Sequence, residues 1–127
     1  MLAAQDCSSE RFKELLVWIQ THPGASLEVE RLADKIGMSP RNFARMFTEE
    51  IGETPGKYVQ RVRVEAARRD LEDSRYDMER IASRSGFGSA EVMRRSFIKL
   101  LNVSPSDYRR RFQSTVDKQI NESPLPD

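Results

Sequence analysis

The chain contains very few of the residues on which catalysis and metal binding rely. Its 127 residues include one cysteine, Cys7, and one histidine, His22. A single cysteine cannot form an internal disulfide, and a histidine with no second histidine or cysteine beside it in sequence does not indicate a metal site. The G-x-x-x-x-G-K-S/T run of phosphate-binding loops is also absent. The sequence therefore predicts no enzyme, no catalytic residue, no cofactor and no metal.

Long apolar runs and strand patterns are missing as well. No apolar stretch approaches the roughly 20 residues that span a membrane, and the N-terminus lacks the basic-then-apolar layout of a secretory signal. Sustained alternation of apolar and polar residues, which is typical of strands, is nearly absent. Helix-forming residues dominate between the prolines and glycines. We therefore expect an all-α protein in the cytoplasm, with no membrane partner.

Charge is nearly balanced over the whole chain but not along it. The formal net charge is +1. Residues 57–112 carry 14 Lys and Arg against 8 Asp and Glu, a net of +6, and the remainder carries 7 against 12, a net of −5. This segregation favours one basic face, although a solvated helix surface would give the same pattern.

An internal repeat is the strongest feature of the sequence. Six residues recur at a spacing of fifty, and two more, Ala33 and Gly37, recur at forty-nine as Ala82 and Gly86. Eight matches at nearly one spacing indicate a duplicated unit. The pairs at fifty are Ser39 and Ser89, Arg45 and Arg95, Phe47 and Phe97, Pro55 and Pro105, Tyr58 and Tyr108, and Arg61 and Arg111.

A long helix is predicted between the two copies. Thr54 followed by Pro55 is a helix start, and about 20 helical residues at about 1.5 Å each make a rod of about 30 Å. The predicted domains are a first helix-turn-helix subdomain, a linker helix, a second such subdomain and a polar tail, at residues 10–53, 54–74, 75–113 and 114–127.

Pro, Gly and Ser punctuate the first unit. Residues 1–9 are expected to be a loose lead-in to a helix that begins at Glu10. Ser26 is expected to cap a second helix, and Gly37 to end it with a positive φ. Ser39 then starts a third helix at once. Two short helices joined by a tight glycine-containing turn make a helix-turn-helix.

The second unit repeats this layout through Gly86 and Ser89. In the helix after Ser89, a set of apolar side chains is expected to be core. A short, basic last helix is expected over residues 105–112, and the final residues of the chain are expected to be mobile. The expected core positions of the helix after Ser89 are Val92, Met93, Phe97 and Leu100 or Leu101.

Arginines on the outward faces of these two helices fit base recognition, because arginine to guanine O6 and N7 is the commonest specific contact in the major groove. Glu91 suits either of two roles: to accept from a cytosine amino group, or to orient Arg94 or Arg95. The predicted base-reading residues are Arg41, Asn42 and Arg45 in the first unit, and Glu91, Arg94 and Arg95 in the second.

The helix starts and the remaining arginines suit the DNA backbone. Ser39 and Ser89, together with the free amides of their helix N-termini, fit phosphate contacts. Some of the arginines are expected to be plain surface charges. The predicted phosphate contacts are Ser39, Ser89, Arg61, Arg63, Arg109, Arg110 and Arg111.

These motifs resemble the DNA-binding domain of the AraC/XylS family of bacterial transcription regulators. Residues 81–112, IASRSGFGSAEVMRRSFIKLLNVSPSDYRRRF, carry the most specific part, and residues 32–59 are similar to the family's first helix-turn-helix. The resemblance implies seven helices, two homeodomain-like helix-turn-helix subdomains joined by a long helix, and binding to double-stranded promoter DNA with contacts to RNA polymerase. On its pattern the base-reading positions match Arg41, Ala44, Arg45, Ala90, Glu91, Arg94 and Arg95.

The family pattern leaves two questions open. At Ala44 and Ala90 the side chain cannot hydrogen-bond a base, so only a thymine methyl contact or close packing is possible.

Most members also carry an effector-binding or dimerisation domain, for which this chain has no room. The chain is therefore either a stand-alone regulator with two motifs or the DNA-binding fragment of a longer protein. The ending SPSDYRRRF resembles members fused to a DJ-1/PfpI-like sensor, and we expect the fragment, with such a domain missing. The alternative to a DNA reader is a helical adaptor that binds only protein.

Overall fold

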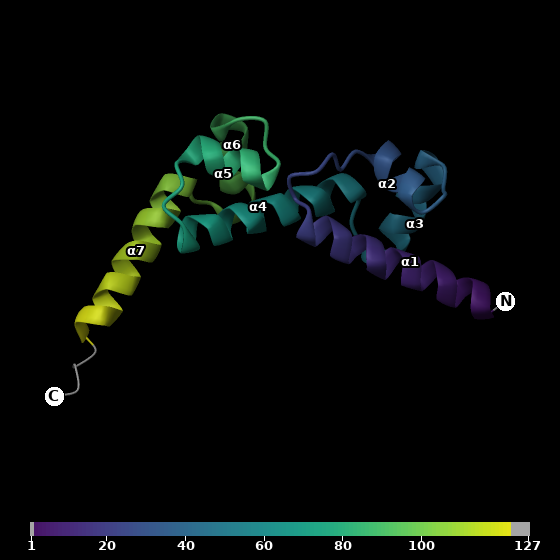
Figure 1. Ribbon diagram of the computed structural model, residues 1–127, viewed down its shortest axis with the longest axis horizontal. Coiled ribbons are helices and arrows are strands. Elements are labelled where there is room, and N and C mark those ends of the chain that lie inside the picture. The colour runs from purple at the N-terminus through teal and green to yellow at the C-terminus, as the bar shows by residue number, and fades with distance from the viewer. Residues whose placement is uncertain (1, 123–127) are drawn as a thin grey trace. The chain divides into compact units, whose positions relative to one another are not determined.

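Seven helices and no strands make up the described part of the chain, as expected for an all-α protein. The structure is a computed structural model that describes the backbone of residues 2–122 and the side chains of residues 10–113. Among these residues, no helix combines the length and apolar character that crossing a bilayer requires. The helices are α1 (Leu2–Thr21), α2 (Val29–Lys35), α3 (Pro40–Ile51), α4 (Pro55–Asp73), α5 (Met78–Ser85), α6 (Ala90–Leu101) and α7 (Pro105–Glu122) (Figure 1).

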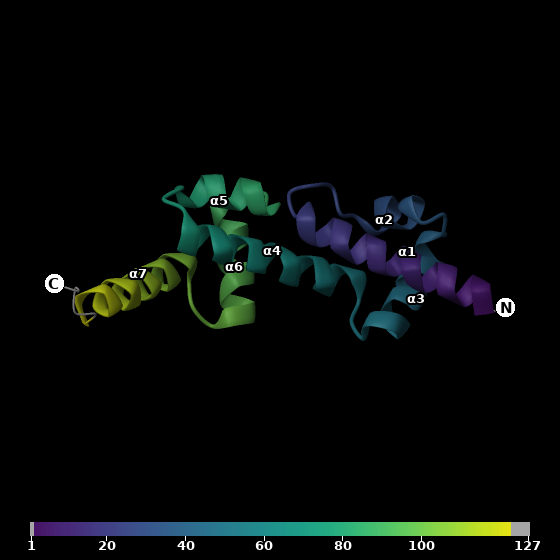
Figure 2. The same ribbon diagram turned by 60° about the horizontal axis from the view of Figure 1, so that its bottom comes forward.

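The chain divides into two compact units, Met1–Arg63 and Val64–Asp127. The boundary falls inside α4, so the segment predicted as a separate linker is helical but is divided between the two units. Each unit contains one pair of short helices, α2 with α3 or α5 with α6, and half of α4. Figure 2 shows α4 continuing as one helix across this boundary.

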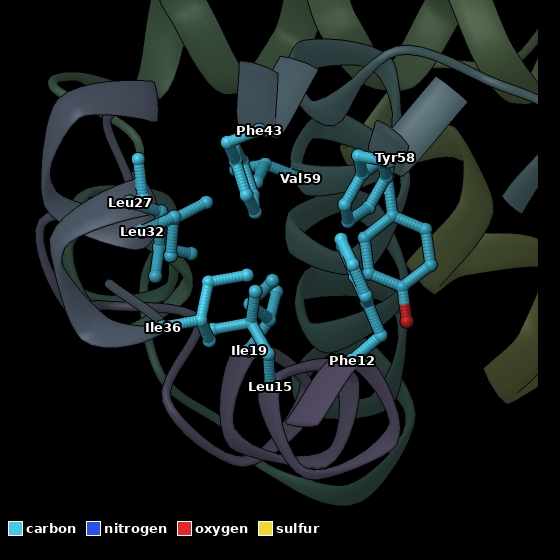
Figure 3. Packing of buried hydrophobic residues seen from close by; sticks show 11 residues of the cluster. Phe12, Leu15, Ile19, Leu27, Leu32, Ile36, Phe43, Tyr58 and Val59 are labelled. Carbon is cyan, nitrogen blue, oxygen red and sulfur yellow. The ribbon is translucent and has the colours of Figure 1, made fainter. Parts of the chain in front are cut away.

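Unit 1 has a core built from α1, α2, α3 and the first half of α4. Phe12 stacks on Phe43 with ring centroids 6.1 Å apart, and Phe47 meets Tyr58 edge-on at 5.5 Å. Figure 3 shows the side chains from these helices pointing into one common interior. The buried members are Phe12, Leu15, Ile19, Leu27, Leu32, Ala33, Ile36, Phe43, Phe47, Tyr58 and Val59.

Unit 2 repeats this core with the second half of α4 in the place of α1. Its α4 residues Val64, Ala67 and Leu71 are buried, and each follows a buried α1 residue by fifty-two positions. Phe97 meets Tyr108 edge-on at 5.6 Å, as Phe47 meets Tyr58 fifty residues earlier. One long helix therefore covers both helix-turn-helix pairs. The buried members are Val64, Ala67, Leu71, Ile81, Ala82, Phe87, Met93 and Phe97.

The two equivalent tyrosines are also held by hydrogen bonds at their hydroxyls. In unit 1, Gln20 Nε2 donates to the Tyr58 hydroxyl over 2.9 Å. In unit 2, the Tyr108 hydroxyl donates to Glu72, fifty-two residues after Gln20, and accepts from Arg68 Nη1 over 3.2 Å. Burial and the bond to Glu72 raise the pKa of Tyr108. Each tyrosine thus ties the last helix of its unit to the first.

Two arginines fix the loop that follows the first helix of each unit. Arg63 donates through Nε to the Pro23 carbonyl at 3.1 Å and through Nη2 to the Ala25 carbonyl at 3.0 Å, and burial lowers the pKa of its guanidinium. Arg109 donates to three carbonyls at the end of α4 and in the loop after it. They are those of Leu71 at 3.3 Å, Ser74 at 3.2 Å and Tyr76 at 2.7 Å.

Several helix bounds differ from the sequence-based expectations. Helix α1 begins at Leu2 rather than Glu10, and α7 continues to Glu122 instead of ending near 112, because neither stretch contains a proline or glycine to stop a helix. The expected polar tail at 114–127 is thus helical as far as Glu122. The final residues expected to be mobile, 123–127, lie outside the described part.

Two further expectations concern individual side chains. Ser26 does not cap α2: the helix follows Glu28 in an extended conformation, and no side-chain hydrogen bond caps it. In α6 only Met93 and Phe97 are buried. Val92, Leu100 and Leu101 are 43%, 39% and 37% exposed. Val92 is one position, or 100°, round the helix from Met93, and the two leucines follow Phe97, the last buried residue of α6.

Ser85 is a polar residue in the core of unit 2, at the position that Ile36 occupies in unit 1. It is 1% exposed, and its hydroxyl has no hydrogen-bond partner in the described structure. Ser85→Ala is expected to stabilise the protein by about 1 kcal/mol more than Ser83→Ala, because it removes an unsatisfied buried group. Ser83 lies on the exposed side of the same helix, so it controls for helix propensity. Equal effects in urea unfolding would refute this expectation.

Arg109 and its neighbour Arg110 allow a matched test of the loop contacts. Arg110 is exposed, and within residues 10–113 its guanidinium pairs only with the carboxylate of Asp107. Arg109→Ala is expected to cost about 1–3 kcal/mol of unfolding free energy, because three carbonyls lose their donor. Arg110→Ala is expected to cost less than about 0.5 kcal/mol. Chemical denaturation measures both, and equal losses would show that the carbonyl contacts contribute nothing.

Candidate nucleic-acid interface

A helix-turn-helix occurs in each unit, with a glycine in the left-handed region at its turn. Gly37 has φ 68° after α2, and Gly86 has φ 91° after α5. In both turns the next residue bonds back to the helix: Met38 N to the Ala33 carbonyl at 2.9 Å, and Phe87 N to the Ala82 carbonyl at 2.8 Å. Glycine adopts this conformation without steric cost. The positive φ predicted at Gly37 is confirmed.

Serine caps open the two helices that follow these turns. Ser39 Oγ accepts from Asn42 N at 3.3 Å, and Ser89 Oγ accepts from Val92 N at 3.2 Å. Each hydroxyl still has a proton to donate, and the helix N-terminus favours an anion beside it. Both predicted phosphate-contacting serines thus lie where a phosphate oxygen would be stabilised.

Helix α3 buries one face and exposes its arginines on the other. Arg41 and Arg45 are exposed, and Asn42 and Ala44 are partly exposed. Arg45 donates to Asn42 Oδ1 at 2.7 Å and to Glu49 Oε1 at 3.3 Å. Arg41 makes no hydrogen bond or ion pair within residues 10–113. One guanidinium is therefore held in place and the other is unrestrained.

Helix α6 has the same layout with different charges. Glu91, Arg94 and Arg95 are exposed, and Ala90 is partly exposed. Glu91 Oε1 accepts from Arg94 Nη1 at 3.3 Å and lies 3.5 Å from Arg95 Nε. The structure therefore brings the three charged residues predicted for this helix together on one surface.

The arginines predicted to contact phosphate fall into two groups. Arg61 and Arg110 are exposed and pair with the carboxylates of Glu53 and Asp107, and Arg111 is exposed. Arg63 and Arg109, in contrast, direct their guanidiniums to the backbone carbonyls described above. That geometry argues against a phosphate role for these two, because their donors already serve the fold.

Sequence reasoning missed two basic residues on α5. Arg80 and Arg84 are exposed and lie over the Tyr76 ring, with guanidinium carbons 4.0 Å and 4.8 Å from its centroid. Arg84 Nε also pairs with Asp70 Oδ2 at 2.9 Å. The first helix of a helix-turn-helix crosses the DNA backbone, so these arginines suit phosphate contacts. Their spacing of four on one short helix was the available signal.

Comparison with known proteins places this arrangement in a family. A family model described as a helix-turn-helix domain matches residues 32–111. An HTH-type transcriptional regulator of Mycobacterium tuberculosis is 51% identical over 89 residues, which are 70% of this chain and 34% of that protein. The HTH-type transcriptional activator RhaS of Citrobacter koseri is 33% identical over 100 residues, 79% of this chain and 36% of RhaS. The chain thus spans about a third of the curated relatives it matches.

Solved structures agree with this assignment. The DNA-binding domain of the global transcriptional factor AdpA, in complex with a target DNA, superposes with a TM-score of 0.78 at 34% identity, covering 81% of this chain and 93% of that one. The C-terminal domain of AraT, a response regulator from Geobacillus stearothermophilus, gives 0.75 at 27% identity over 80% and 84%. The chain therefore belongs to the AraC/XylS family of helix-turn-helix transcription regulators.

Proposed function

We propose that this chain is the sequence-specific DNA-binding part of a transcription regulator, and that α3 and α6 read bases in the major groove of promoter DNA. The observation that carries the proposal is structural. Each unit presents a serine-capped helix whose buried face holds it in place and whose opposite face exposes arginine. The relatives named as transcriptional regulators and the DNA-bound AdpA domain support it.

In α3 the readers are Arg41, Asn42, Ala44 and Arg45. Arg45 is oriented by the Asn42 amide oxygen, and a guanidinium held in this way loses less entropy when it contacts guanine O6 and N7. Arg41 contacts a second base, and it does so without first breaking a hydrogen bond or ion pair within the described residues. Ala44 sits between the arginines on the outward face, where a small side chain admits a thymine methyl.

In α6 the readers are Ala90, Glu91, Arg94 and Arg95. The arginines are suited to guanine, and the carboxylate of Glu91 is suited to the amino group of cytosine. Ala90, in the first turn, leaves space for the bases to approach. Because each unit has its own reading helix, the proposed site on DNA contains two boxes.

Phosphate contacts fix the register of the reading helices but carry no sequence information. The serine caps, the helix N-termini and the exposed arginines are suited to them, and the loop-bound Arg63 and Arg109 are not included. The proposed phosphate contacts are Ser39, Ser89, Arg61, Arg80, Arg84, Arg110 and Arg111.

The length and the names of the relatives bear on the rest of the regulator. Relatives about three times as long include transcriptional activators by name. We infer that an effector-binding or dimerisation domain belongs to the same regulator, and that DNA-bound units contact RNA polymerase. The size ratio supports the first inference, and the activator names support the second.

Selection of bound duplexes from a random DNA pool, at near-physiological salt, tests the two-box site. Two enriched boxes about ten base pairs apart are expected, one for each reading helix. A single box would mean that one unit reads sequence and the other does not. No enrichment, with tight binding only at low salt, would leave non-specific charge attraction and favour a protein-binding adaptor.

Single arginine substitutions test the reading faces on the selected site. Arg45→Ala and Arg95→Ala are each expected to weaken binding by about 1–3 kcal/mol and to relax preference at one base pair, in the α3 box and the α6 box respectively. Lys13→Ala removes an exposed charge from α1 and is expected to change affinity by less than about 0.5 kcal/mol. Titration against the selected duplex and single-base variants measures this. An arginine variant that binds every duplex as the parent does would remove that residue from the reading face.

A further inference from the structure

We propose that Glu91 makes α6 selective for cytosine at one position, because its carboxylate disfavours the other bases there. Its carboxylate holds Arg94 and Arg95 when no cytosine is present, and releases them when it accepts from a cytosine amino group. The inference rests on the proposed function, because it assigns roles within a helix proposed to read bases. The second box then requires one particular base, and every other base at that position lowers the affinity.

The contact geometry shows that one carboxylate oxygen serves both arginines. Glu91 Oε1 lies 3.3 Å from Arg94 Nη1 and 3.5 Å from Arg95 Nε. All three side chains are more than half exposed, so the ion pairs are weak in water and can open when a better partner is offered. With its carboxylate ionised, Glu91 gives this group of three side chains one net positive charge, where the two arginines alone would carry two.

The equivalent positions of α3 carry different charges from those of α6. Fifty residues before Glu91 stands Arg41, and fifty before Arg94 stands Ala44. Arg45, the counterpart of Arg95, has its carboxylate partner one turn further along, at Glu49. In α3 the start of the helix therefore meets DNA with arginine alone, whereas in α6 a carboxylate occupies the same place.

A carboxylate at that place restricts which bases are acceptable. It has only acceptors, and the major-groove edges of guanine and thymine present acceptors to it. Cytosine presents an amino donor, and the paired guanine then offers O6 and N7 to a released arginine. Adenine is a poorer match because its N7 acceptor lies beside its amino group. The second box is therefore expected to contain a C·G pair at the Glu91 position.

A purely structural explanation of Glu91 is available, since an acidic residue in the first turn favours the helix. That role predicts a change in stability when the charge is removed, and no change in base preference. Base preference therefore separates the two explanations.

The experiment compares Glu91→Gln with the parent in the same random-pool selection and in titrations over a range of salt. We expect the C·G preference to be lost in the α6 box while the α3 box is unchanged. Affinity for duplexes lacking the cytosine should rise about tenfold, and the slope of log affinity against log salt should steepen by about one unit. Asp73→Asn makes the same charge change on an exposed residue of unit 2 outside α6, and is expected to leave every base preference intact.

The outcomes separate failure of this inference from failure of the proposed function. If the parent selects no box at all, the proposed function fails. If the parent selects both boxes and Glu91→Gln keeps the C·G preference, the exclusion by Glu91 is overturned while DNA reading stands. A fall in affinity for duplexes lacking the cytosine would also overturn it, because Glu91 would then be an ordinary contact. Thermal melting of both variants confirms that each is folded.

Discussion

The fold depends on burying the apolar faces of two pairs of short helices, α2 with α3 and α5 with α6. These helices are too short to be stable alone, so longer helices must pack against them. Helix α2 has 7 residues and α3 has 12, and isolated helices of that length are marginal in water. Each pair is stabilised by a helix on either side. Helix α4 serves both units. Its residues Tyr58 and Val59 are buried in the first core, and Val64, Ala67 and Leu71 are buried in the second.

Covering the apolar faces on one side leaves the opposite faces of α3 and α6 open to solvent. Phe43 and Phe47 are fully buried while Arg41 and Arg45 stay exposed on the same helix. The cores hold the reading helices rigidly, and the serine caps set where each begins. A helix held in this way presents its side chains to DNA with little further ordering, which is what specific recognition needs.

Local signals in the sequence predicted much of this fold, and contacts distant in sequence account for what they missed. The glycine turns and the caps at Ser39 and Ser89 depend on residues a few positions apart, so residue type was sufficient to predict them, whereas the cap expected at Ser26 does not form. The role of Arg109 depends on backbone carbonyls 33 to 38 positions away, and its charge is the same as that of exposed Arg110. The burial of Val64 likewise depends on how α4 is divided between the units, which its own helical periodicity does not reveal.

The duplicated units also show which features the fold constrains and which it leaves free. Several positions that set the backbone or the core keep their chemistry, as in Ser39 with Ser89 and Phe47 with Phe97, although Ser85 stands where the first copy has Ile36. On the outward faces the copies differ, with Arg41 against Glu91 and Ala44 against Arg94. Because exposed side chains contribute little to stability, charge there can change without loss of the fold. Two copies of one scaffold can thus present different surfaces to solvent, and the proposed exclusion by Glu91 is one consequence of that freedom.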